Sequence, residues 1–303
     1  MTAVNDLYAT DEACGDSWRL LLGDSCERLA ELADASVDLS VCSPPFAQLY
    51  NYSPSPRDLS NNRTREEFFE HYSFIIREQL RVTKPGRIAA LHVQDITRQK
   101  VLHGVIGLSD FSGQVIAAFE REGWIYDGRV TIDKDPQAQA IRTKSQSLLF
   151  VTLRRDSSMT RPALPDYLLK FRAPGENTTP IIAELTNDEW IEWARPIWYG
   201  IRETDTLNTA VAKEDKDERH ICPLQLPLID RVLRLWSNKG ETVLSPFAGI
   251  GSEGYQAIKR GRRFIGIELK PLYWQVACKN LTRAEDDANA PMLWPDEAEV
   301  VSP

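Results

Sequence analysis

Short apolar runs alternate with amphipathic segments along most of the chain. The runs have the length of strands, and between them apolar residues recur every three or four positions, as on one face of a helix. Strands are predicted over residues 18–23, 37–42, 87–93, 124–132, 148–153, 242–247 and 264–268. Helices are predicted over residues 24–32, 64–80, 115–121, 223–238 and 252–260, and from residue 271 onward. This alternation indicates an α/β fold.

Residues 134–176 interrupt that pattern. They hold eight basic and four acidic residues, a net charge of +4 in a chain whose net charge is −8. Periodicity is weak, and a group of aromatic residues follows, made of Trp190, Trp193, Trp198 and Tyr199. We interpret the segment as an inserted module. The three tryptophans also suit the packed core of a small subdomain, and the charge run over residues 214–219 suits a solvated surface.

Composition excludes several classes of protein. With 303 residues, 42% hydrophobic and 26% charged, the chain can bury a core and is not disordered overall. No apolar run approaches the roughly 20 residues of a membrane span, and the acidic start is unlike a secretory signal. Five cysteines without a CxxC pair predict reduced thiols and a cytoplasmic location. Four histidines without an HExxH spacing predict no metal site. The negative net charge argues against a nonspecific nucleic-acid coat but leaves a local basic patch open.

A glycine-rich loop lies between a predicted strand and a predicted helix, where residues 243–254 read VLSPFAGIGSEG. Gly249, Gly251 and Gly254 form a GxGxxG pattern, and Glu268 ends the next predicted strand. Such a loop lets the backbone approach a ligand, and a carboxylate at that strand tip commonly binds ribose hydroxyls. The pattern predicts a nucleotide-like ligand, with a plain strand–helix turn as the alternative. Only one strand follows the loop, so the N-terminal half is expected to supply the rest of the sheet, in a circularly permuted order.

A second motif, Ser43-Pro44-Pro45-Phe46, follows the apolar run over residues 37–42. Two consecutive prolines cannot donate to a sheet, so the chain must leave the sheet there. With both motifs in this order, the chain resembles the amino-group DNA methyltransferases of the β arrangement, which methylate cytosine N4 or adenine N6. The resemblance covers most of residues 18–283, and the whole also resembles stand-alone phage or prophage methylases.

The resemblance implies a Rossmann-like, S-adenosylmethionine-dependent methyltransferase fold with circularly permuted motif order and an inserted target-recognition region. The implied cofactor is S-adenosyl-L-methionine, and the implied partner is double-stranded DNA with an extruded target base. A homodimer is left open, and no membrane or metal partner is expected. The resemblance divides the chain into a flexible N-terminus (residues 1–14), a catalytic half (15–133), a target-recognition region (134–215), a cofactor-binding half (216–284) and an acidic tail (285–303).

The resemblance also implies a catalytic role for the motif at residues 43–46. The exocyclic amine of a base is a poor nucleophile, because its lone pair is delocalised into the ring. Ser43 and the carbonyl of Pro44 would accept hydrogen bonds from the amine and favour a lone pair on its nitrogen. Pro45 would help to hold that carbonyl rigidly, and Phe46 would stack on the extruded base. No covalent intermediate is required, so Cys42 is interpreted as strand interior.

The serine of this motif favours cytosine N4 as the target, with adenine N6 as the alternative. Two other classes compete with methyl transfer. An NAD-dependent oxidoreductase could use the same glycine loop, but no histidine or lysine is marked as its catalytic residue. A catalytically silent DNA-binding protein is the other, and the intact motif at residues 43–46 argues against it.

The resemblance assigns cofactor binding to eight residues, namely Asp24, His220, Phe247, Ala248, Gly249, Gly251, Ser252 and Glu268. Glu268 would bind the ribose of the cofactor, and Asp24 would meet its adenine amino group. The other residues of this set, apart from His220, would line its methionine part. His220 is also consistent with a capping or buried histidine. Many relatives carry an acid where this chain has Ser245, so that position is not assigned to the cofactor's amino group.

DNA is expected to meet the basic segment, with Arg142, Lys144, Arg154 and Arg155 as contacts to phosphates or base edges. The alternative for Arg154 and Arg155 is that they end a strand and keep its edge soluble.

Overall fold

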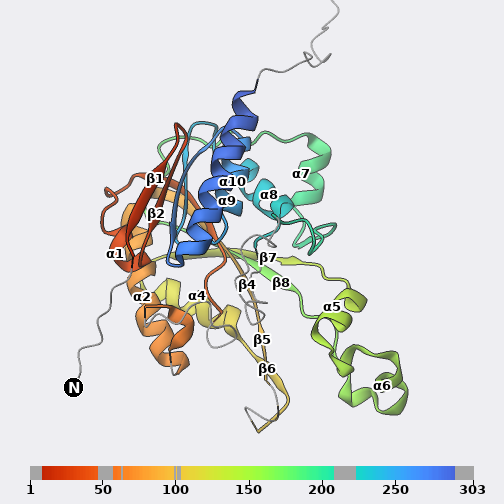
Figure 1. The fold of residues 1–303 in the computed structure, drawn as a ribbon. Helices are drawn as coiled ribbons and strands as arrows, with labels where there is room; N and C mark the ends of the chain where they lie inside the picture. The colour runs from red at the N-terminus through yellow and green to blue at the C-terminus, as the bar shows by residue number, and fades with distance from the viewer. Residues whose placement is uncertain are drawn as a thin grey trace, which may run out of the picture.

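One mixed sheet organises the protein. The structure is a computed structural model, and it describes residues 9–46, 57–62, 64–98, 100, 104–207 and 223–290. Nine of the described strands form the sheet, in the order β1-β2-β11-β10-β3-β4-β8-β7-β9, and β5 and β6 form a separate pair (Figure 1). The strands are β1 Asp11–Cys14, β2 Trp18–Leu22, β3 Val37–Cys42, β4 Thr83–Gln94, β5 Ile96–Arg98, β6 Gly107–Ser109, β7 Ile125–Ile132, β8 Asp166–Arg172, β9 Ile197–Trp198, β10 Thr242–Ser245 and β11 Arg263–Glu268.

The centre of the sheet is parallel. Each pair of neighbours from β2 to β4 runs in the same direction, whereas β1 pairs antiparallel with β2, and β8 with both β4 and β7. Every residue of β3 is buried, as expected for a strand covered on both faces. β10 and β11 come late in the chain but lie between β2 and β3. The strands of the two halves therefore interleave in the permuted order that the motifs predict.

Helices cover both faces of the sheet (Figure 1). Apolar residues of α1, α2 and α4 share one core with one face, and those of α8, α9 and α10 share a second core with the other. No described helix is long and apolar enough to cross a membrane. The helices are α1 Ser25–Leu29, α2 Arg65–Val82, α4 Phe111–Arg121, α5 Pro136–Thr143, α6 Phe150–Arg155, α7 Asn187–Trp193, α8 Leu226–Trp236, α9 Ser252–Lys259 and α10 Pro271–Asn289, with short 3-10 turns η1 Leu59–Asn61, η2 Gln146–Leu148 and η3 Ser157–Met159.

Two helix starts follow the predicted capping residues. Thr64 caps α2, since its side chain accepts a hydrogen bond from the Glu67 backbone at 3.1 Å and the Glu67 carboxylate accepts one from the Thr64 backbone. Asp24 caps α1 through the Cys26 backbone at 2.9 Å. That helix ends at Leu29, three residues before the predicted end.

The strand predicted over residues 148–153 is wrong, because residues 150–155 form α6. A short apolar run suits either element, and here its side chains are largely in solvent, with Phe150 68% exposed. The position beside β7 belongs instead to β8, which pairs along its whole length with both β4 and β7. Residues 134–215 are therefore not one separate module, since β8 in their middle is an internal strand of the sheet.

The boundaries expected for the flexible N-terminus and for the acidic tail both differ in the structure. Residues 11–14, placed in a flexible N-terminus, form the edge strand β1. The acidic tail does not begin at residue 285, because α10 continues to Asn289. The Glu285 carboxylate accepts hydrogen bonds from the backbone and hydroxyl of Ser17, at 2.7 and 2.5 Å. These contacts tie α10 to the turn that precedes β2.

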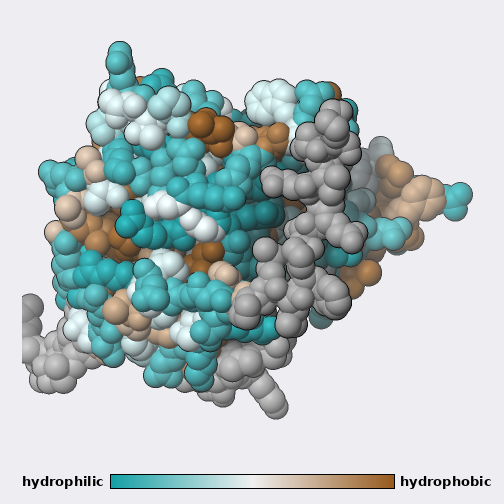
Figure 2. All heavy atoms as spheres, turned by 90° about the horizontal axis from the view of Figure 1, so that it is seen from above, coloured by the Kyte–Doolittle hydropathy of each residue, from teal (hydrophilic) through white to brown (hydrophobic). Residues whose placement is uncertain are grey.

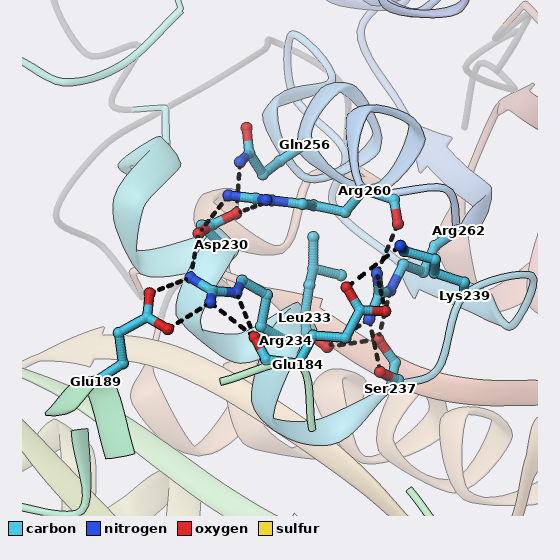
Figure 3. A network of polar contacts seen from close by, with 10 residues as sticks. All are labelled: Glu184, Glu189, Asp230, Leu233, Arg234, Ser237, Lys239, Gln256, Arg260 and Arg262. Atoms are coloured by element: carbon cyan, nitrogen blue, oxygen red, sulfur yellow. Dashed lines mark hydrogen bonds and ion pairs between the residues drawn. The ribbon is translucent and has the colours of Figure 1, made fainter. Parts of the chain in front are cut away.

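Polar contacts join α7 to α8, and α8 to α9 and the residue that follows it (Figure 3). Glu189 accepts hydrogen bonds from both terminal nitrogens of Arg234, at 2.8 and 2.7 Å, and this pairing lowers the pKa of Glu189 to about 2. Arg234 also donates to the carbonyl of Glu184 at 2.7 Å. Asp230, one turn earlier on α8, accepts from Arg260, which follows α9. The segment from Glu184 to α7 is thus joined to the main body.

The three tryptophans that also suited the core of a small subdomain differ in their exposure. Trp198 is 1% exposed and donates to the carbonyl of Trp193 at 2.9 Å, so it packs in the core. Trp193 lies under the guanidinium of Arg234, 4.8 Å from its ring centroid. Trp190 is 54% exposed.

Candidate active site

Four parallel strands end side by side and bring the predicted residues together. β2, β11, β10 and β3 are consecutive neighbours in the sheet, so their carboxyl ends share one edge. Asp24 follows β2, Ser43 follows β3, Phe247 follows β10, and Glu268 ends β11. All four residues line a single pocket. Open α/β sheets bind ligands at this edge, and here two motifs far apart in the chain meet in one site.

The pocket gathers most of the predicted site residues. Its walls include Asp24, Ser43, Pro44, Pro45, Phe46, Phe247, Ala248, Gly249, Ser252 and Glu268. Gly251 lies in the same turn, as the residue that caps α9. His220 lies outside the described residues. Asp24 also meets Arg57, whose Nη1 is 3.3 Å from its Oδ2.

Two glycines of the turn have a left-handed backbone conformation, but a side chain would meet a neighbouring residue at only one of them. Gly251 has a φ of +85°, and a Cβ there would lie 3.2 Å from the Cβ of Ala277 on α10. Gly249 has a φ of +52°, but a Cβ there would meet nothing within 4 Å. The Gly249 backbone donates to Oε2 of Glu268 at 2.8 Å, which joins the turn to the tip of β11. The turn is thus tightly packed behind Gly251 and open at Gly249.

Two carboxyl groups in the pocket are poised to titrate near neutral pH. Burial, with the nearby charge of Asp58, raises the pKa of Glu268 to about 7, although its oxygens accept from the backbones of Gly249 and Lys270. Burial likewise raises the pKa of Glu253 to about 8. Glu253 is 4% exposed and was missed in the sequence, although it belongs to the glycine motif itself. A cationic ligand would stabilise the ionised form of both groups.

The motif at residues 43–46 leaves the sheet as predicted and lies against the pocket. The Ser43 hydroxyl is 3.1 Å from the carbonyl oxygen of His92 and 3.4 Å from its Nδ1. The Phe46 ring packs against Phe111, with centroids 5.8 Å apart. Cys42 is fully buried, and burial raises the pKa of its thiol. The interpretation of Cys42 as strand interior is confirmed.

A buried charged cluster lies behind Ser43, and sequence reasoning missed it. Nε2 of His92 is 2.9 Å from Oδ2 of Asp166, and Nζ of Lys134 is 2.5 Å from the same oxygen. Gln94 donates to the other carboxylate oxygen at 2.8 Å. Burial raises the pKa of Asp166, but His92 and Lys134 outweigh that effect and hold the pKa below its usual value. The sequence pattern does not indicate this cluster, because it does not predict β8 and because Lys134 belongs to the basic segment of residues 134–176.

Residues 136–161, which include α5 and α6, form a projection that extends away from the sheet (Figure 1). The four predicted DNA-binding residues belong to this projection, and none of them lines the pocket. This projection holds five basic residues and one acidic residue, Asp156. Arg142 pairs with Glu203 at 2.7 Å and is 52% exposed, while Arg154 lies over the Phe150 ring. Figure 2 shows brown, hydrophobic atoms where the molecule extends to the right. The exposed apolar side chains of residues 136–161 are Ile141, Leu149, Phe150, Val151, Leu153 and Met159.

Comparison with known proteins identifies the family. A family model described as DNA methylase matches residues 37–279. The chain belongs to this DNA methylase family. The predicted resemblance to amino-group DNA methyltransferases is thereby confirmed. The alternative function of an NAD-dependent oxidoreductase is not supported. S-adenosyl-L-methionine is the methyl donor of the family, as predicted.

Individual proteins that resemble this chain also carry methyltransferase or methylase names. The type II methyltransferase M.BglI of Bacillus subtilis is 35% identical over 166 residues, a match that spans 54% of this chain and 41% of that protein. TTHA0409 of Thermus thermophilus, solved in complex with S-adenosyl-L-methionine, is 23% identical with a TM-score of 0.63, covering 87% of this chain and 94% of that one. The cytosine-N4-specific PvuII DNA methyltransferase is 15% identical with a TM-score of 0.62, covering 93% and 96%. These structures confirm the Rossmann-like methyltransferase fold.

Proposed function

We propose that this DNA methylase transfers a methyl group from S-adenosyl-L-methionine to the N4 amine of cytosine in double-stranded DNA, with the target base extruded into the pocket. The observation that carries the proposal is the meeting of the two motifs. Ser43 to Phe46 and the glycine turn line one pocket, so a base amine and a methyl donor can be held side by side. Positioning of this kind is the main requirement for transfer from an already activated donor.

The glycine side of the pocket fits the donor. The space beside Gly249 is open, and the Glu268 carboxylate at the tip of β11 can accept hydrogen bonds from ribose hydroxyls. The buried acids Glu253 and Glu268 suit a ligand that carries positive charge. When bound, the donor supplies a methyl carbon on a positively charged sulfur, which keeps the electron pair of the broken C–S bond.

The other side of the pocket fits an amine. A Ser43 hydroxyl that donates its proton to His92 turns its lone pairs outward, so it accepts a hydrogen bond from the base amine. The carbonyl of Pro44 would accept the second amine proton, and Phe46 would stack on the base. Serine at position 43 supports cytosine N4, since aspartate is more common there in relatives that methylate adenine N6.

The projection of residues 136–161 is proposed to bind the DNA around the target base. Its excess of basic residues supplies affinity for phosphates, and this local positive charge stands out in a chain with a net charge of −8. Arg142, Lys144, Arg154 and Arg155 are the proposed contacts. Exposed side chains such as Phe150 and Leu153 could insert beside a displaced base.

Incubation with mixed-sequence DNA and isotope-labelled donor, followed by digestion to nucleosides and mass spectrometry, tests this function. We expect labelled N4-methylcytosine. Labelled N6-methyladenine would keep the methyltransferase and correct the base. Transfer to neither base, across DNA that covers all short sequence contexts, would overturn the proposal.

A further inference from the structure

Three adjacent strands place a serine, a histidine and an aspartate in line behind the pocket. Ser43 follows β3, His92 lies on β4, and Asp166 begins β8. The Ser43 hydroxyl is 3.4 Å from Nδ1 of His92, and Nε2 of the same ring is 2.9 Å from the Asp166 carboxylate. Ser43 lines the pocket, while the ring of His92 is held behind it and is largely buried. His92 would therefore act on a bound base only through Ser43.

The partners of Asp166 determine which ring nitrogen carries the proton. Asp166 is 5% exposed, and it accepts from Lys134 at 2.5 Å and from Gln94 at 2.8 Å. These donors favour its ionised form, and a carboxylate can only accept. Nε2 of His92 must then carry a proton and donate it to Asp166. In the neutral ring, Nδ1 keeps a free lone pair, and that lone pair faces Ser43.

The hydroxyl of Ser43 has two acceptors on the same residue. The carbonyl of His92, at 3.1 Å, can hold the hydroxyl proton but cannot take it up. Nδ1, at 3.4 Å, can both accept the hydrogen bond and become protonated. A simple structural role for Ser43 would need only the carbonyl. His92 also helps Lys134 to keep Asp166 ionised, but that contact uses Nε2 alone. The placement of Nδ1 beside the Ser43 hydroxyl is what requires an explanation.

We propose that His92 and Asp166 are positioning residues of the methyl transfer, which orient Ser43 and receive through it the proton that the amine loses. This inference rests on the proposed function. When the lone pair of the amine nitrogen bonds to the methyl carbon, the nitrogen carries one proton in excess. That proton moves to Oγ of Ser43 as the hydroxyl proton moves to Nδ1 of His92. The resulting imidazolium faces the Asp166 carboxylate until it returns its proton to water, so no oxidant or further reactant is needed.

Single-turnover transfer with His92→Gln and His92→Ala measures this role. Glutamine can still donate to Asp166 but cannot take up a proton, whereas alanine removes that contact, and both variants leave the ion pair of Lys134 with Asp166 in place. We expect each variant to slow transfer by roughly 10- to 100-fold, which is at or below the roughly 10²-fold lower limit of direct general acid–base contributions, because His92 acts only through Ser43. Affinities for donor and for DNA should stay within about twofold, because His92 does not line the pocket. Added imidazole should restore rate to His92→Ala and not to His92→Gln.

His71→Gln is the matched control, because His71 is an exposed histidine on α2. It should leave the transfer rate unchanged. A native rate in both His92 variants would overturn the proton role and leave the carbonyl of His92 as the only partner that Ser43 needs. A loss of rate without rescue by imidazole, accompanied by weaker donor or DNA binding, would assign His92 a structural role and also overturn the proposal.

A measurement without turnover separates this inference from the proposed function. Nitrogen-15 NMR of the four histidine side chains, with His92 assigned through His92→Gln, reports which ring nitrogen is protonated. We expect the neutral ring of His92 to carry its proton on Nε2, and we expect that preference to shift in Asp166→Asn. A proton on Nδ1 in the native protein would overturn the proposal even if transfer is fast. If the native protein methylates no DNA, the proposed function fails, and the proton role fails with it, whatever the ring state.

Discussion

The pocket at the strand ends is fixed by buried strands, whereas the projection of residues 136–161 stands almost entirely in solvent. β3 is buried throughout, and the glycine turn is hydrogen-bonded to the tip of β11. In the projection, α6 has no buried residue, and Ile141 on α5 is 80% exposed. Segments with few buried contacts open and shift at a lower free-energy cost than core strands do.

This difference in burial indicates which substitutions should alter methyl transfer and which should alter DNA binding. A pocket built from strand ends holds its groups in fixed positions, which methyl transfer requires. An exposed basic projection can adapt to a DNA surface without disturbing those positions. Substitutions in the pocket should therefore change donor binding or the rate of transfer, and substitutions in the projection should change DNA affinity alone. The following predictions test that separation, from the largest expected effect to the smallest.

Gly249→Val should lower donor affinity by about 100-fold or more. A side chain at Gly249 meets open space in the structure, and that space is where the donor is proposed to lie. Filling it carries the cost of overpacking on top of lost contacts. Isothermal titration calorimetry with S-adenosyl-L-methionine gives the affinity.

Gly240→Val is the control for backbone strain. Gly240 also has a positive φ, +77°, and open space for a Cβ, but it precedes β10 at the opposite end of the strand. Both variants should lose similar thermal stability, and only Gly249→Val should lose donor affinity. Equal losses of affinity would show that strain, and not occupation of the pocket, is the cause.

Ser43→Ala should lower the single-turnover rate by roughly 10²-fold while donor affinity is retained, because it removes one positioned polar contact to the amine. Ser40→Ala is a suitable control, since Ser40 is a buried serine on the same strand and does not line the pocket. An unchanged rate in Ser43→Ala would remove Ser43 from the mechanism.

The parts of the molecule that the sequence predicted share a physical basis. Ser43 to Phe46 and Gly249 to Ser252 are local motifs, in which proline and glycine determine where the backbone turns. Their placement in one pocket followed from parallel strands, whose carboxyl ends share an edge. The strands and helices flanking them were predicted because each has one regular apolar periodicity.

The parts that were missed depend on contacts between distant residues. Asp166 and His92 are brought together only by the pairing of β8 with β4, and the apolar run at residues 148–153 competed for the same place in the sheet. Lys134 looks like a surface charge until its buried contact with Asp166 is seen. The role of Glu285 depends on a hydrogen bond to Ser17, across almost the whole chain.

Arg154→Glu with Arg155→Glu should weaken DNA binding of any sequence by roughly tenfold at moderate salt, and should leave donor affinity unchanged. Each phosphate contact contributes roughly 0.9 to the slope of log K against log salt, so the slope should become shallower by up to about 1.8. Fluorescence anisotropy over a salt series measures both quantities.

The matched control reverses two exposed basic residues elsewhere, Lys279 and Arg283 on α10. This pair changes the net charge by the same amount, so a similar loss of DNA affinity would mean that total charge acts, and not the projection. If the Arg154 and Arg155 variant keeps both its affinity and its slope, these arginines only keep an exposed helix soluble.

The smallest expected effect is a rise of donor affinity with pH that belongs to the pocket alone. The pKa of Glu268 is raised to about 7, so its carboxyl is mostly protonated at pH 6 and mostly ionised at pH 8. Ribose hydroxyls and a cationic donor favour the ionised form, so affinity should increase by up to about tenfold across this range, with proton release on binding near pH 7. Calorimetry in buffers of different ionisation enthalpy measures the affinity and the protons together. Glu268→Gln should bind more weakly at pH 8 and lose this step, leaving only the later rise that Glu253 produces as it ionises with a pKa of about 8. Glu31→Gln, an exposed glutamate paired with Arg28, should retain the native profile. A profile that is the same in native protein and Glu268→Gln would place the titrating group on the donor and remove Glu268 from its binding.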